Sequence, residues 1–514
     1  MRPEGFLERL SDPHGGTRLS WQILAVLLAL YTASFFSFYP TSAVNEDEAM
    51  YIRQARLLVE GRASLDKLDP LTGAEQVYLP ATYPIGTAVI MSPFVSAVGW
   101  KGAWIASLLS LALGVALCAR WLQDAGRSPL FALLLLGSPS ALVLGRVGLS
   151  DVPSLALVAL GLWLFWRGLD RAWPWWLASG FVAGVSLAFR ATNPLPFVPF
   201  FAGTVLRREL KCWALVVGGL AGVSMRILSS YLIHGDALFE RSAYHFAPET
   251  VLDRLPFYAL ALLVFIPGGL VAALAYKGRR RPEVVLSVAL FVTLYLFQIY
   301  SSSTTGFAKR VLLAPRYLLP ILPVIVFAMG ESVPRLWRHL VAWWEARERA
   351  VPLARIAAVA LSVWIAGIAC AGVGVHWAFD RWTATQREIR DEIHRHTGDD
   401  SVVFTNLPAT KKFIRFLDRK YLPVERRKSE PGDAGTLVER HGEFFVVFLD
   451  RSDSEWWRAD ARGNAAFIES LDPPPDLELD RQITPTDRLR IWRVSQVRAS
   501  GGGSRVPAGD GSGR

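Results

Sequence analysis

Charge is scarce in this sequence. Only 19% of the 514 residues are Asp, Glu, Lys or Arg, whereas soluble domains carry about 25%. Residues 1–376 hold 54 of the charged residues and residues 377–514 hold the other 46. The first part has too few charges to coat a soluble surface, and the second has enough. This distribution excludes a chain of soluble domains, and also a purely disordered or fibrous protein.

Cysteine is scarcer still, with three in the whole chain. Each lies in or beside an apolar stretch, so the sequence predicts neither a disulfide framework nor a cysteine metal cluster. The excess of basic over acidic residues is confined to residues 1–376, with 32 against 22, while residues 377–514 are balanced at 23 against 23. A nucleic-acid-binding protein needs a basic soluble surface, so no nucleic acid is expected as a partner.

What remains is a large set of apolar runs. A spanning helix needs about 20 mostly apolar residues, and the sequence predicts about eleven spans, approximately at 20–40, 101–120, 129–145, 152–167, 173–190, 192–206, 212–233, 256–276, 284–300, 314–331 and 355–376. The candidates at 152–167 and 192–206 are short, so broken or re-entrant segments are expected among the eleven. We expect a membrane domain at 1–376, a soluble domain at 377–498 and a disordered Gly/Ser-rich tail at 499–514.

Lys and Arg are unevenly divided between the loops. When the N-terminus is placed in the cytoplasm, the Arg-rich connections fall on its side and the opposite loops are poorer in Lys and Arg. This positive-inside bias predicts a multi-pass protein of the cytoplasmic (inner) membrane. An odd number of spans then puts the C-terminal domain outside. The first span is longer than the apolar core of a signal peptide and is expected to be an uncleaved anchor.

The C-terminal domain alternates strand and helix signals. Strands are expected at 401–405, 444–449 and 489–494, and helices at 411–418 and 455–471. The pattern predicts a small α/β domain. It contains no glycine-rich phosphate loop and no nucleophile elbow, so no chemistry is assigned to it.

The first predicted outward loop opens with three consecutive carboxylates, Glu46, Asp47 and Glu48. Apolar residues recur at helical spacing from 47 to 60, which predicts an amphipathic helix lying on the membrane. Carboxylates in the first turn of a helix are stabilised by its dipole. From the residues alone, capping and solvated charge explain the acidic run better than catalysis does.

Three more charged residues interrupt apolar sequence near the predicted outer side. Asp151 begins a span, where Ser150 and Asp151 are natural capping residues, and Arg190 and Arg316 lie in other spans or at their ends. Snorkelling to the interface explains the arginines. Two arginines close to carboxylates would also make an anion site at the lipid boundary.

Weaker signals lie in two other predicted outward loops. One contains His234, Glu240, His245 and Glu249, without the tight spacing of metal ligands. The other, 301–313, contains Lys309 and Arg310, which are candidates to contact a phosphate.

Taken together, the motifs resemble those of the GT-C glycosyltransferases, in the bacterial branch that includes protein O-mannosyltransferase-like enzymes and the lipid A aminoarabinose transferases. The similarity rests on the order of five motifs, on their spacing and on the side of the membrane where they are predicted to lie. The motifs are Asp47-Glu48-Ala49-Met50-Tyr51 with Ala55-Arg56, Tyr83-Pro84 with the apolar segment 85–98, Arg146…Asp151-Val-Pro-Ser-Leu, the Arg190 segment, and Arg316-Tyr317-Leu-Leu-Pro. It covers residues 20–376. It implies a polytopic α-helical membrane protein of the GT-C type, with a small extracytoplasmic α/β domain.

The resemblance also implies an activity. Such an enzyme transfers one sugar, a hexose or a pentose, from a polyprenyl-phosphate carrier to an extracytoplasmic acceptor, which can be a lipid, a glycan or a protein. Direct displacement with inversion is expected, with Asp47 as general base, and the first outward loop, 41–100, is expected to be catalytic. Asp151 and Glu48 are the other catalytic candidates. The implied substrate-binding residues are Tyr51, Arg56, Tyr83, Arg146, Arg190, Lys309, Arg310, Arg316 and Tyr317.

The sequence does not identify a cofactor with certainty. A divalent metal is left open, with Glu46 and His245 as candidate ligands. The chain departs from the family pattern at two positions, since members often have Lys before Pro84, where Tyr83 stands, and many have Arg in place of Met50. These departures argue against an aminoarabinose transferase.

Three other classes of protein remain as alternatives. A multi-span transporter would share the spans and the membrane-depth charges, but the sequence shows no inverted repeat. A lipid-linked glycan ligase or polymerase would concentrate basic residues in one large outward loop, whereas the 41–83 loop begins with acidic residues. A membrane-anchored binding module would not need so many spans.

Overall fold

The computed structural model describes most of the chain. The described residues are 16–62, 65–68, 75–78, 83–235, 251–297, 314–345, 353–398, 401–405, 422–424, 431–451, 468–469 and 471–497. They divide into a helical unit (1–43, 50–64 and 79–380) and a sheet unit (44–49, 65–78 and 381–514).

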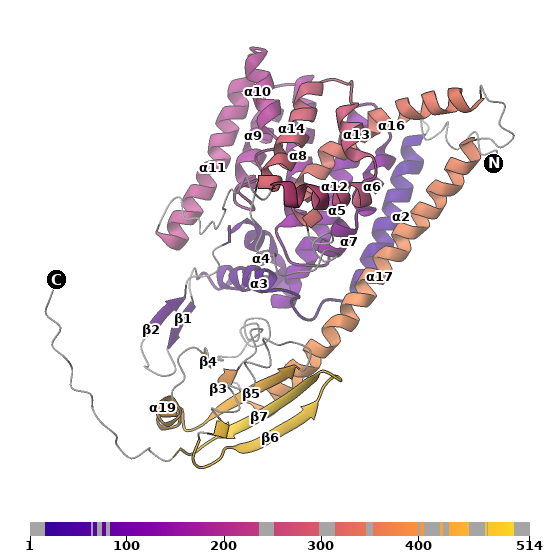
Figure 1. Cartoon of the computed structure of the whole chain (residues 1–514). Helices are drawn as coiled ribbons and strands as arrows, with labels where there is room; N and C mark the ends of the chain where they lie inside the picture. The colour runs from indigo at the N-terminus through magenta and orange to yellow at the C-terminus, as the bar shows by residue number, and fades with distance from the viewer. Residues whose placement is uncertain are drawn as a thin grey trace. The chain divides into compact units, whose positions relative to one another are not determined.

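The helical unit is a bundle of apolar helices (Figure 1). Helices α3 (Glu46–Val59) and α17 (Leu353–His396) have residues in both units. The remaining elements are α2 (Gly16–Ser37), α4 (Gly86–Val98), η1 (Trp100–Gly102), α5 (Ala103–Asp124), η2 (Pro129–Ala132), α6 (Leu133–Leu136), α7 (Pro139–Leu144), α8 (Asp151–Leu169), α9 (Pro174–Ser186), α10 (Val198–Leu206), α11 (Cys212–His234), α12 (Val251–Phe265), α13 (Gly269–Leu274), α14 (Arg281–Phe297), η4 (Ala314–Ile321) and α16 (Leu322–Glu345).

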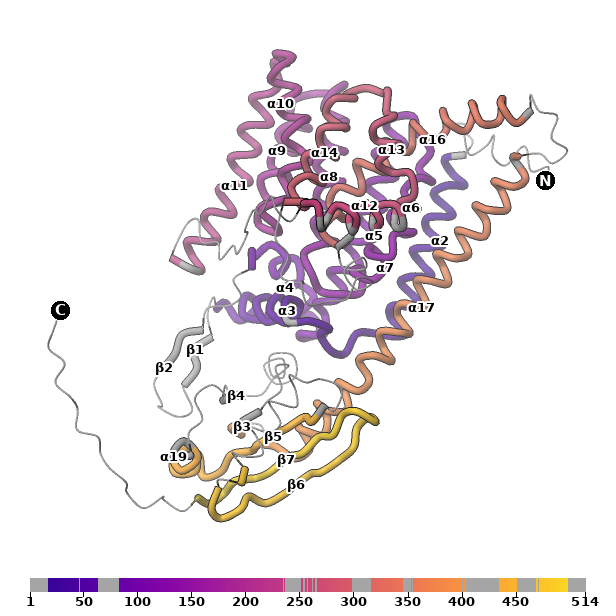
Figure 2. The backbone as a smooth tube through the Cα atoms, in the orientation of Figure 1, coloured from indigo at the N-terminus to yellow at the C-terminus, as the bar shows by residue number. Residues whose placement is uncertain are grey.

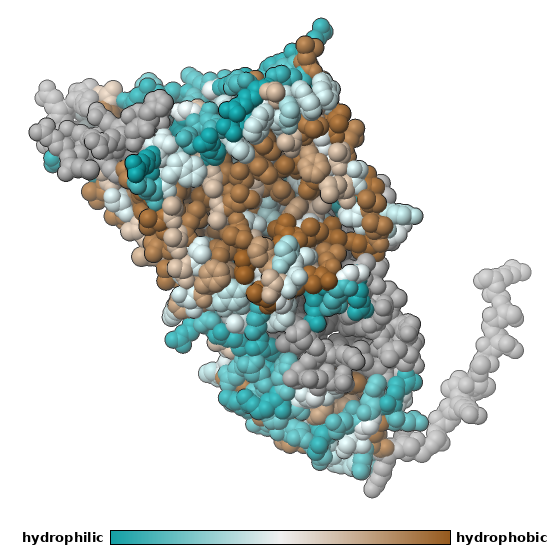
Figure 3. Space-filling model, turned by 180° about the vertical axis from the view of Figure 1, so that it is seen from behind, coloured by the Kyte–Doolittle hydropathy of each residue, from teal (hydrophilic) through white to brown (hydrophobic). Residues whose placement is uncertain are grey.

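Within the described residues, six helices are long and apolar enough to cross a membrane: Thr17–Ser37, Trp100–Asp124, Asp151–Leu169, Cys212–Ile233, Arg316–Trp344 and Arg355–His396. Figure 3 shows a broad hydrophobic band across one face of the helical unit, with hydrophilic residues at its upper edge. The protein is therefore a multi-pass membrane protein. The number of spans, about eleven, stays a prediction, because several apolar runs do not form single helices.

Two of these runs are broken at Pro and Gly. The run 129–145 divides into η2, α6 and α7 around Gly137 and Pro139. The run 256–276 divides into α12 and α13 where Gly268 adopts a φ of +73°, a conformation that is accessible to glycine without steric cost. The composition predicts that these segments are apolar. Their proline and glycine residues interrupt the helices, so the segments are not continuous helices.

Helices α9 and α11 are packed backbone to backbone. A methyl group added to Gly180 or Gly184 would collide with the backbone of α11 near Gly219. These small residues therefore allow the two helices to pack closely. The opposite face of α11 carries exposed apolar side chains, as expected for a surface that lies against lipid.

The sheet unit contains a five-stranded mixed sheet in the order β4-β3-β5-β7-β6. Its strands are β3 (Val402–Thr405), β4 (Leu422–Val424), β5 (Phe444–Arg451), β6 (Asp476–Gln482) and β7 (Asp487–Val494). β3 is parallel to both β4 and β5, and β7 is antiparallel to β5 and β6. A separate hairpin joins β1 (Leu65–Leu68) to β2 (Glu75–Tyr78).

Both faces of the five-stranded sheet are covered. Ile389 and Ile393 of α17 pack on one face, and Ala434 and Leu437 of α19 (Pro431–His441) pack on the other. This explains the continuous apolar run of β5, because a strand that is buried on both faces has no polar side. The predicted α/β domain is present, while β4, β6 and α19 were not predicted from the sequence.

Some predicted features of this unit lie elsewhere than expected, and others lie outside the described residues. The domain boundary predicted after residue 376 falls inside α17, which continues as one helix to His396 (Figure 2). The predicted helix 411–418 lies outside the described residues, as does most of 455–471 and all of the tail 499–514.

Candidate functional site

A buried ion pair joins two of the predicted site residues in the helical unit. Asp151 lies in the first turn of α8, and Arg190 lies in the turn that follows α9. Nη1 of Arg190 donates to Oδ1 of Asp151 at 2.7 Å, with side-chain exposures of 15% and 3% respectively. A charge-assisted hydrogen bond in a buried setting is strong. Asp151 therefore holds the guanidinium of Arg190 in place.

The N-terminus of α8 is further tied to the segment after Arg190. Nδ2 of Asn193 donates to Oγ of Ser154 at 2.8 Å and to the carbonyl of Ser186 at 3.1 Å. Ser150, predicted as a capping residue, makes no side-chain capping bond. Ser154 and Asn193 therefore join the start of α8 to the segment after α9, whereas the side chain of Ser150 does not cap α8.

Tyr317 of η4 lies between two arginines. The Cζ of Arg190 lies 4.9 Å from the centre of the Tyr317 ring, and the Cζ of Arg316 lies 4.7 Å from it. Arg316 also donates a hydrogen bond to the Tyr317 hydroxyl. The aromatic ring attracts both cations and brings them close together. The structure thus assembles Asp151, Arg190, Arg316 and Tyr317 into one group, which we call the arginine–tyrosine cluster.

Two residues that the sequence did not suggest extend this cluster. Tyr295, near the end of α14, packs against Tyr317 with ring centres 5.6 Å apart and the ring planes tilted by 32°. Its hydroxyl shares a hydrogen bond of 2.8 Å with Thr192 Oγ1. Neither residue interrupts an apolar run with a charge, so the only available signal was a tyrosine in the second half of a predicted span.

Helices α3 and α4 bring two more predicted residues near the cluster. The rings of Tyr51 and Tyr83 lie 5.1 Å apart. Ser92 of α4 donates to the carbonyl of Ala55 in α3 at 3.4 Å, so the two helices are in contact. The segment that carries Tyr83 is therefore part of the same region of the helical unit.

The position of α4 depends on Gly86. The Gly86 amide donates to the carbonyl of Ala188 at 2.6 Å, two residues before Arg190. An added Cβ would lie 2.6 Å from both this carbonyl and the ring of Phe189. Only a residue without a side chain allows the two backbones to come this close.

We expect Gly86→Ala to destabilise the protein by about 1–3 kcal/mol, because overpacking a tight contact forces backbone shifts. The shift would displace Tyr83 and lower activity. Thermal denaturation in nanodiscs measures the effect, and Gly374→Ala is the control, because a Cβ there meets nothing within 4 Å. Equal melting temperatures for the two variants would show that α4 is not held by this contact.

The acidic motif begins α3, as predicted. Oδ1 of Asn45 accepts from the amide of Glu48 at 2.8 Å, and Oε2 of Glu48 accepts from the amide of Val44 at 2.6 Å. This reciprocal arrangement is close to a capping box. Glu48 is buried, whereas Asp47 is partly exposed. Glu48 thus stabilises the start of α3, and Asp47 lies one turn before Tyr51 on the same helix.

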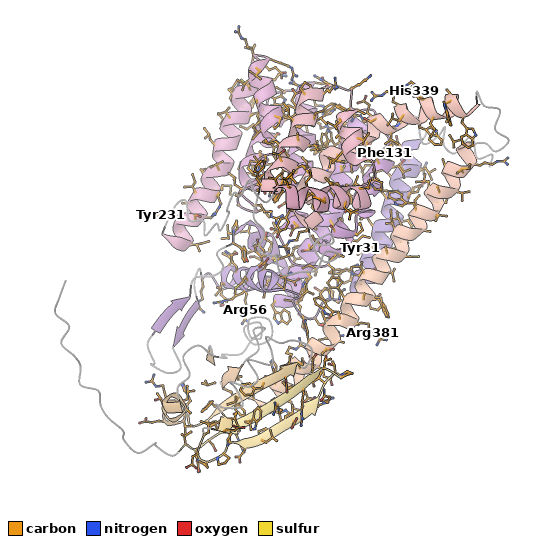
Figure 4. The ribbon with its side chains drawn as sticks, in the orientation of Figure 1. Tyr31, Arg56, Phe131, Tyr231, His339 and Arg381 are labelled. Carbon is orange, nitrogen blue, oxygen red and sulfur yellow. The ribbon has the colours of Figure 1, made fainter. Side chains whose placement is uncertain are left out.

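Arg146 and Arg56 have structural partners of their own. Arg146 is buried, donates to the carbonyl of Phe38, and lies 3.4 Å from Nδ1 of His376. It therefore ties α2 to α17. Arg56, labelled in Figure 4, pairs with Glu60 at 3.0 Å on an exposed part of α3. The predicted contacts of both arginines with substrate stay predictions.

Lys309, Arg310 and His245 lie outside the described residues, as do the side chains of Glu46 and His234. Among the residues that the structure describes, no three His, Cys, Asp or Glu side chains are grouped as metal ligands.

Comparisons with known proteins identify the fold. No family model matches the chain. The cytochrome c-type biogenesis protein CcmF of Haemophilus influenzae is 30% identical over 188 residues, covering 30% of this chain. The chain spans about a quarter, 26%, of that protein's length.

Solved structures match far more of the chain. ArnT from Cupriavidus metallidurans bound to undecaprenyl phosphate aligns with a TM-score of 0.57 and 14% identity, over 93% of this chain and 98% of ArnT. The apo state of ArnT gives a TM-score of 0.58 with the same identity and coverage. The apo oligosaccharyltransferase of Archaeoglobus fulgidus gives 0.47 at 11% identity, over 83% of this chain and 69% of that protein.

The ArnT alignments include nearly the whole of both chains. The protein therefore has the GT-C fold of membrane glycosyltransferases, as the sequence motifs predicted. At this level of identity the similarity defines the fold, and the reaction has to be argued from the residues.

Proposed function

We propose that this protein is a glycosyltransferase that moves a single sugar from a polyprenyl-phosphate carrier to an extracytoplasmic acceptor. The observation that carries the proposal is the arginine–tyrosine cluster within a GT-C fold. Clustered cations within an apolar bundle suit an anion carried by a lipid, because the lipid cannot leave the bilayer and the phosphate cannot enter it unpaired. ArnT, which has the same fold, has been crystallised with undecaprenyl phosphate.

In this proposal Arg190 and Arg316 bind the carrier phosphate. A guanidinium presents its donors in a planar fork that matches phosphate oxygens, and Asp151 and Tyr317 restrict how these forks can turn. Asp151 is then a positioning residue for Arg190, rather than the catalytic residue that the family resemblance implied. Tyr51, Tyr83 and Tyr317 are proposed to contact the substrate.

Asp47 is proposed as the general base. It takes the proton of the acceptor hydroxyl as the acceptor oxygen forms a bond to the anomeric carbon. The bond from that carbon to the carrier phosphate breaks, and polyprenyl phosphate leaves with the electron pair. One displacement inverts the anomeric configuration. The partial exposure of Asp47 at the start of α3 supports this role, because a base must reach an acceptor arriving from water.

The same proposal places the protein in the inner membrane with its N-terminus in the cytoplasm. The asymmetry of Lys and Arg between the loops supports this orientation. A cysteine introduced between residues 60 and 75 should then react with an impermeant maleimide in intact spheroplasts. Labelling only after permeabilisation would reverse the orientation.

The proposed activity is tested with the purified full chain in proteoliposomes that contain a panel of polyprenyl-phosphate sugars. Mass spectrometry of the cell envelope from a deletion strain first identifies the glycan, lipid or protein that loses one sugar, and therefore the acceptor. The reconstituted protein should then convert the corresponding lipid-linked sugar to free polyprenyl phosphate when that acceptor is present. An unchanged envelope together with no turnover of any donor would refute the proposal.

A further inference from the structure

One side chain of α3 carries an amide group that is buried and unpaired. Gln54 is 1% exposed, and in the described part of the chain neither its Oε1 nor its Nε2 has a hydrogen-bond partner. The buried amide of Asn193, in contrast, donates to both Ser154 and Ser186. Among the described residues, Gln54 is the only buried amide side chain with both polar atoms unpaired. Buried polar groups are normally hydrogen-bonded, so this one requires an explanation.

Helix geometry places Gln54 on the face of α3 that carries two of the predicted site residues. At 3.6 residues per turn, Gln54 lies about 60° from Tyr51 around the helix axis and about 20° from Asp47. Arg56 lies about 160° from Gln54 on the same measure, and there it is exposed and paired with Glu60 (Figure 4). The unpaired amide is therefore on the face of the proposed base and not on the solvated face.

Contacts within the helical unit join this face of α3 to the arginine–tyrosine cluster. The rings of Tyr51 and Tyr83 lie 5.1 Å apart. Three residues after Tyr83, the amide of Gly86 donates to the carbonyl of Ala188 at 2.6 Å, two residues before Arg190. In the donor the sugar is bonded directly to the carrier phosphate. A sugar whose phosphate is bound by Arg190 therefore lies in the region that these contacts bring together.

The chemistry of the amide suits a sugar that carries no charge. Oε1 of a glutamine accepts a hydrogen bond and Nε2 donates, so one side chain can bind two adjacent hydroxyl groups. A site that is built to bind a hydroxyl strongly rejects an analogue without it, because the polar group of the site is then buried and unpaired. An ammonium or a carboxylate would instead need a counter-charge when buried, which an amide cannot provide.

We propose that Gln54 is a specificity-determining residue that binds two adjacent hydroxyl groups of an uncharged donor sugar. Arg190 and Arg316 then bind the phosphate, Gln54 selects the sugar, and Asp47 activates the acceptor. This inference rests on the proposed function and names the class of sugar for it.

Binding is measured by titrating the full chain in nanodiscs with undecaprenyl phosphate, bare or carrying mannose, glucose, galactose or arabinose. The wild type should bind one of the sugar-bearing lipids more tightly than bare undecaprenyl phosphate. Gln54→Met keeps the length of the side chain and removes the amide. It should weaken binding of that lipid about 10–100-fold, as expected when buried polar groups lose their partners, and leave the affinity for bare undecaprenyl phosphate unchanged. Its melting temperature should not fall, because an unpaired polar group is replaced by an apolar one.

Two comparisons make the result specific. Monodeoxy analogues of the bound sugar are titrated against both proteins, and the analogue that lacks a hydroxyl bound by Gln54 should bind weakly and almost equally to wild type and Gln54→Met. Gln386→Met is the matched control, because Gln386 lies in the part of α17 that belongs to the sheet unit and also has a buried amide oxygen without a partner among the described residues. It should bind every lipid like the wild type.

The outcomes separate this inference from the proposed function. Equal affinities of wild type and Gln54→Met for the sugar-bearing lipid would overturn the role of Gln54. An equal loss of bare undecaprenyl phosphate binding in the variant would also overturn it, because the effect would not depend on the sugar. If the wild type binds bare undecaprenyl phosphate but gains nothing from any of the four sugars, the inference fails and the proposed function stands. If the wild type binds undecaprenyl phosphate no better than uncharged undecaprenol, the proposed function itself fails.

Discussion

Asp47→Asn is expected to abolish sugar transfer. The amide has nearly the same shape as the carboxylate and can remain in the first turn of α3, but it cannot accept a proton from the acceptor hydroxyl. General-base catalysis contributes about 10²–10⁴ in rate, so kcat should fall by that factor while KM for the donor changes little. The measurement is single-turnover transfer in proteoliposomes, with expression and melting temperature recorded for each variant.

Two controls make this result specific. Glu60→Gln removes a carboxylate from the residue that directly follows α3, where it is exposed and paired with Arg56, and it should leave transfer unchanged. Asp47→Glu keeps the base on a longer side chain and should retain part of the activity. If Asp47→Asn turns over at the wild-type rate, Asp47 is not the base. If the variant has a lower melting temperature, Asp47 instead stabilises the start of α3 as a capping residue.

The second large effect is expected at the ion pair between Asp151 and Arg190. Asp151→Asn leaves a buried guanidinium without its counter-charge, and breaking a buried pair in this way costs about 3–5 kcal/mol. Arg190→Gln should cost less, because an unpaired buried carboxylate can take up a proton, whereas an arginine side chain keeps its charge. Both variants should also lose transfer, since each disturbs a cation proposed to bind the carrier phosphate.

The double variant Asp151→Asn with Arg190→Gln distinguishes stability from activity. Two amides can hydrogen-bond to each other, so the melting temperature should recover toward that of the wild type while transfer stays lost. Asp170→Asn is the matched control, because Asp170 pairs with Arg279 at a similar distance, 2.8 Å, but with exposures of 71% and 48%. Surface pairs contribute about 0–1 kcal/mol. A double variant with normal transfer would exclude Arg190 from phosphate binding.

Much of the site could be identified residue by residue before the fold was known. Asp47, Asp151, Arg190 and Arg316 are charges beside or within apolar sequence, and burying a charge is costly enough to make each position conspicuous. Which of them meet was not predictable from the sequence. Helices α8 and α9 lie between Asp151 and Arg190 in the sequence. The contact of the two residues depends on how the start of α8 packs against the turn after α9.

The uncharged members of the site were missed for a related reason. Tyr295 and Thr192 carry hydroxyls that apolar spans tolerate, so nothing in their local sequence distinguishes them. Gly86 is conspicuous only once Ala188 lies against it. The roles of Glu48 and Arg146 also depend on their partners, because a buried carboxylate or guanidinium is structural or catalytic according to what it contacts.

The sequence by itself determined that this is a multi-pass membrane protein with a separate α/β domain, because apolar runs and the distribution of charge are properties of composition. It also determined the amphipathic α3, since helical periodicity and an acidic first turn are local. Only the tertiary structure decided the breaks in the apolar runs, the order of the sheet strands and the assembly of the arginine–tyrosine cluster. Each of these depends on contacts between residues far apart in the chain, whose free energy exists only when the segments are packed together.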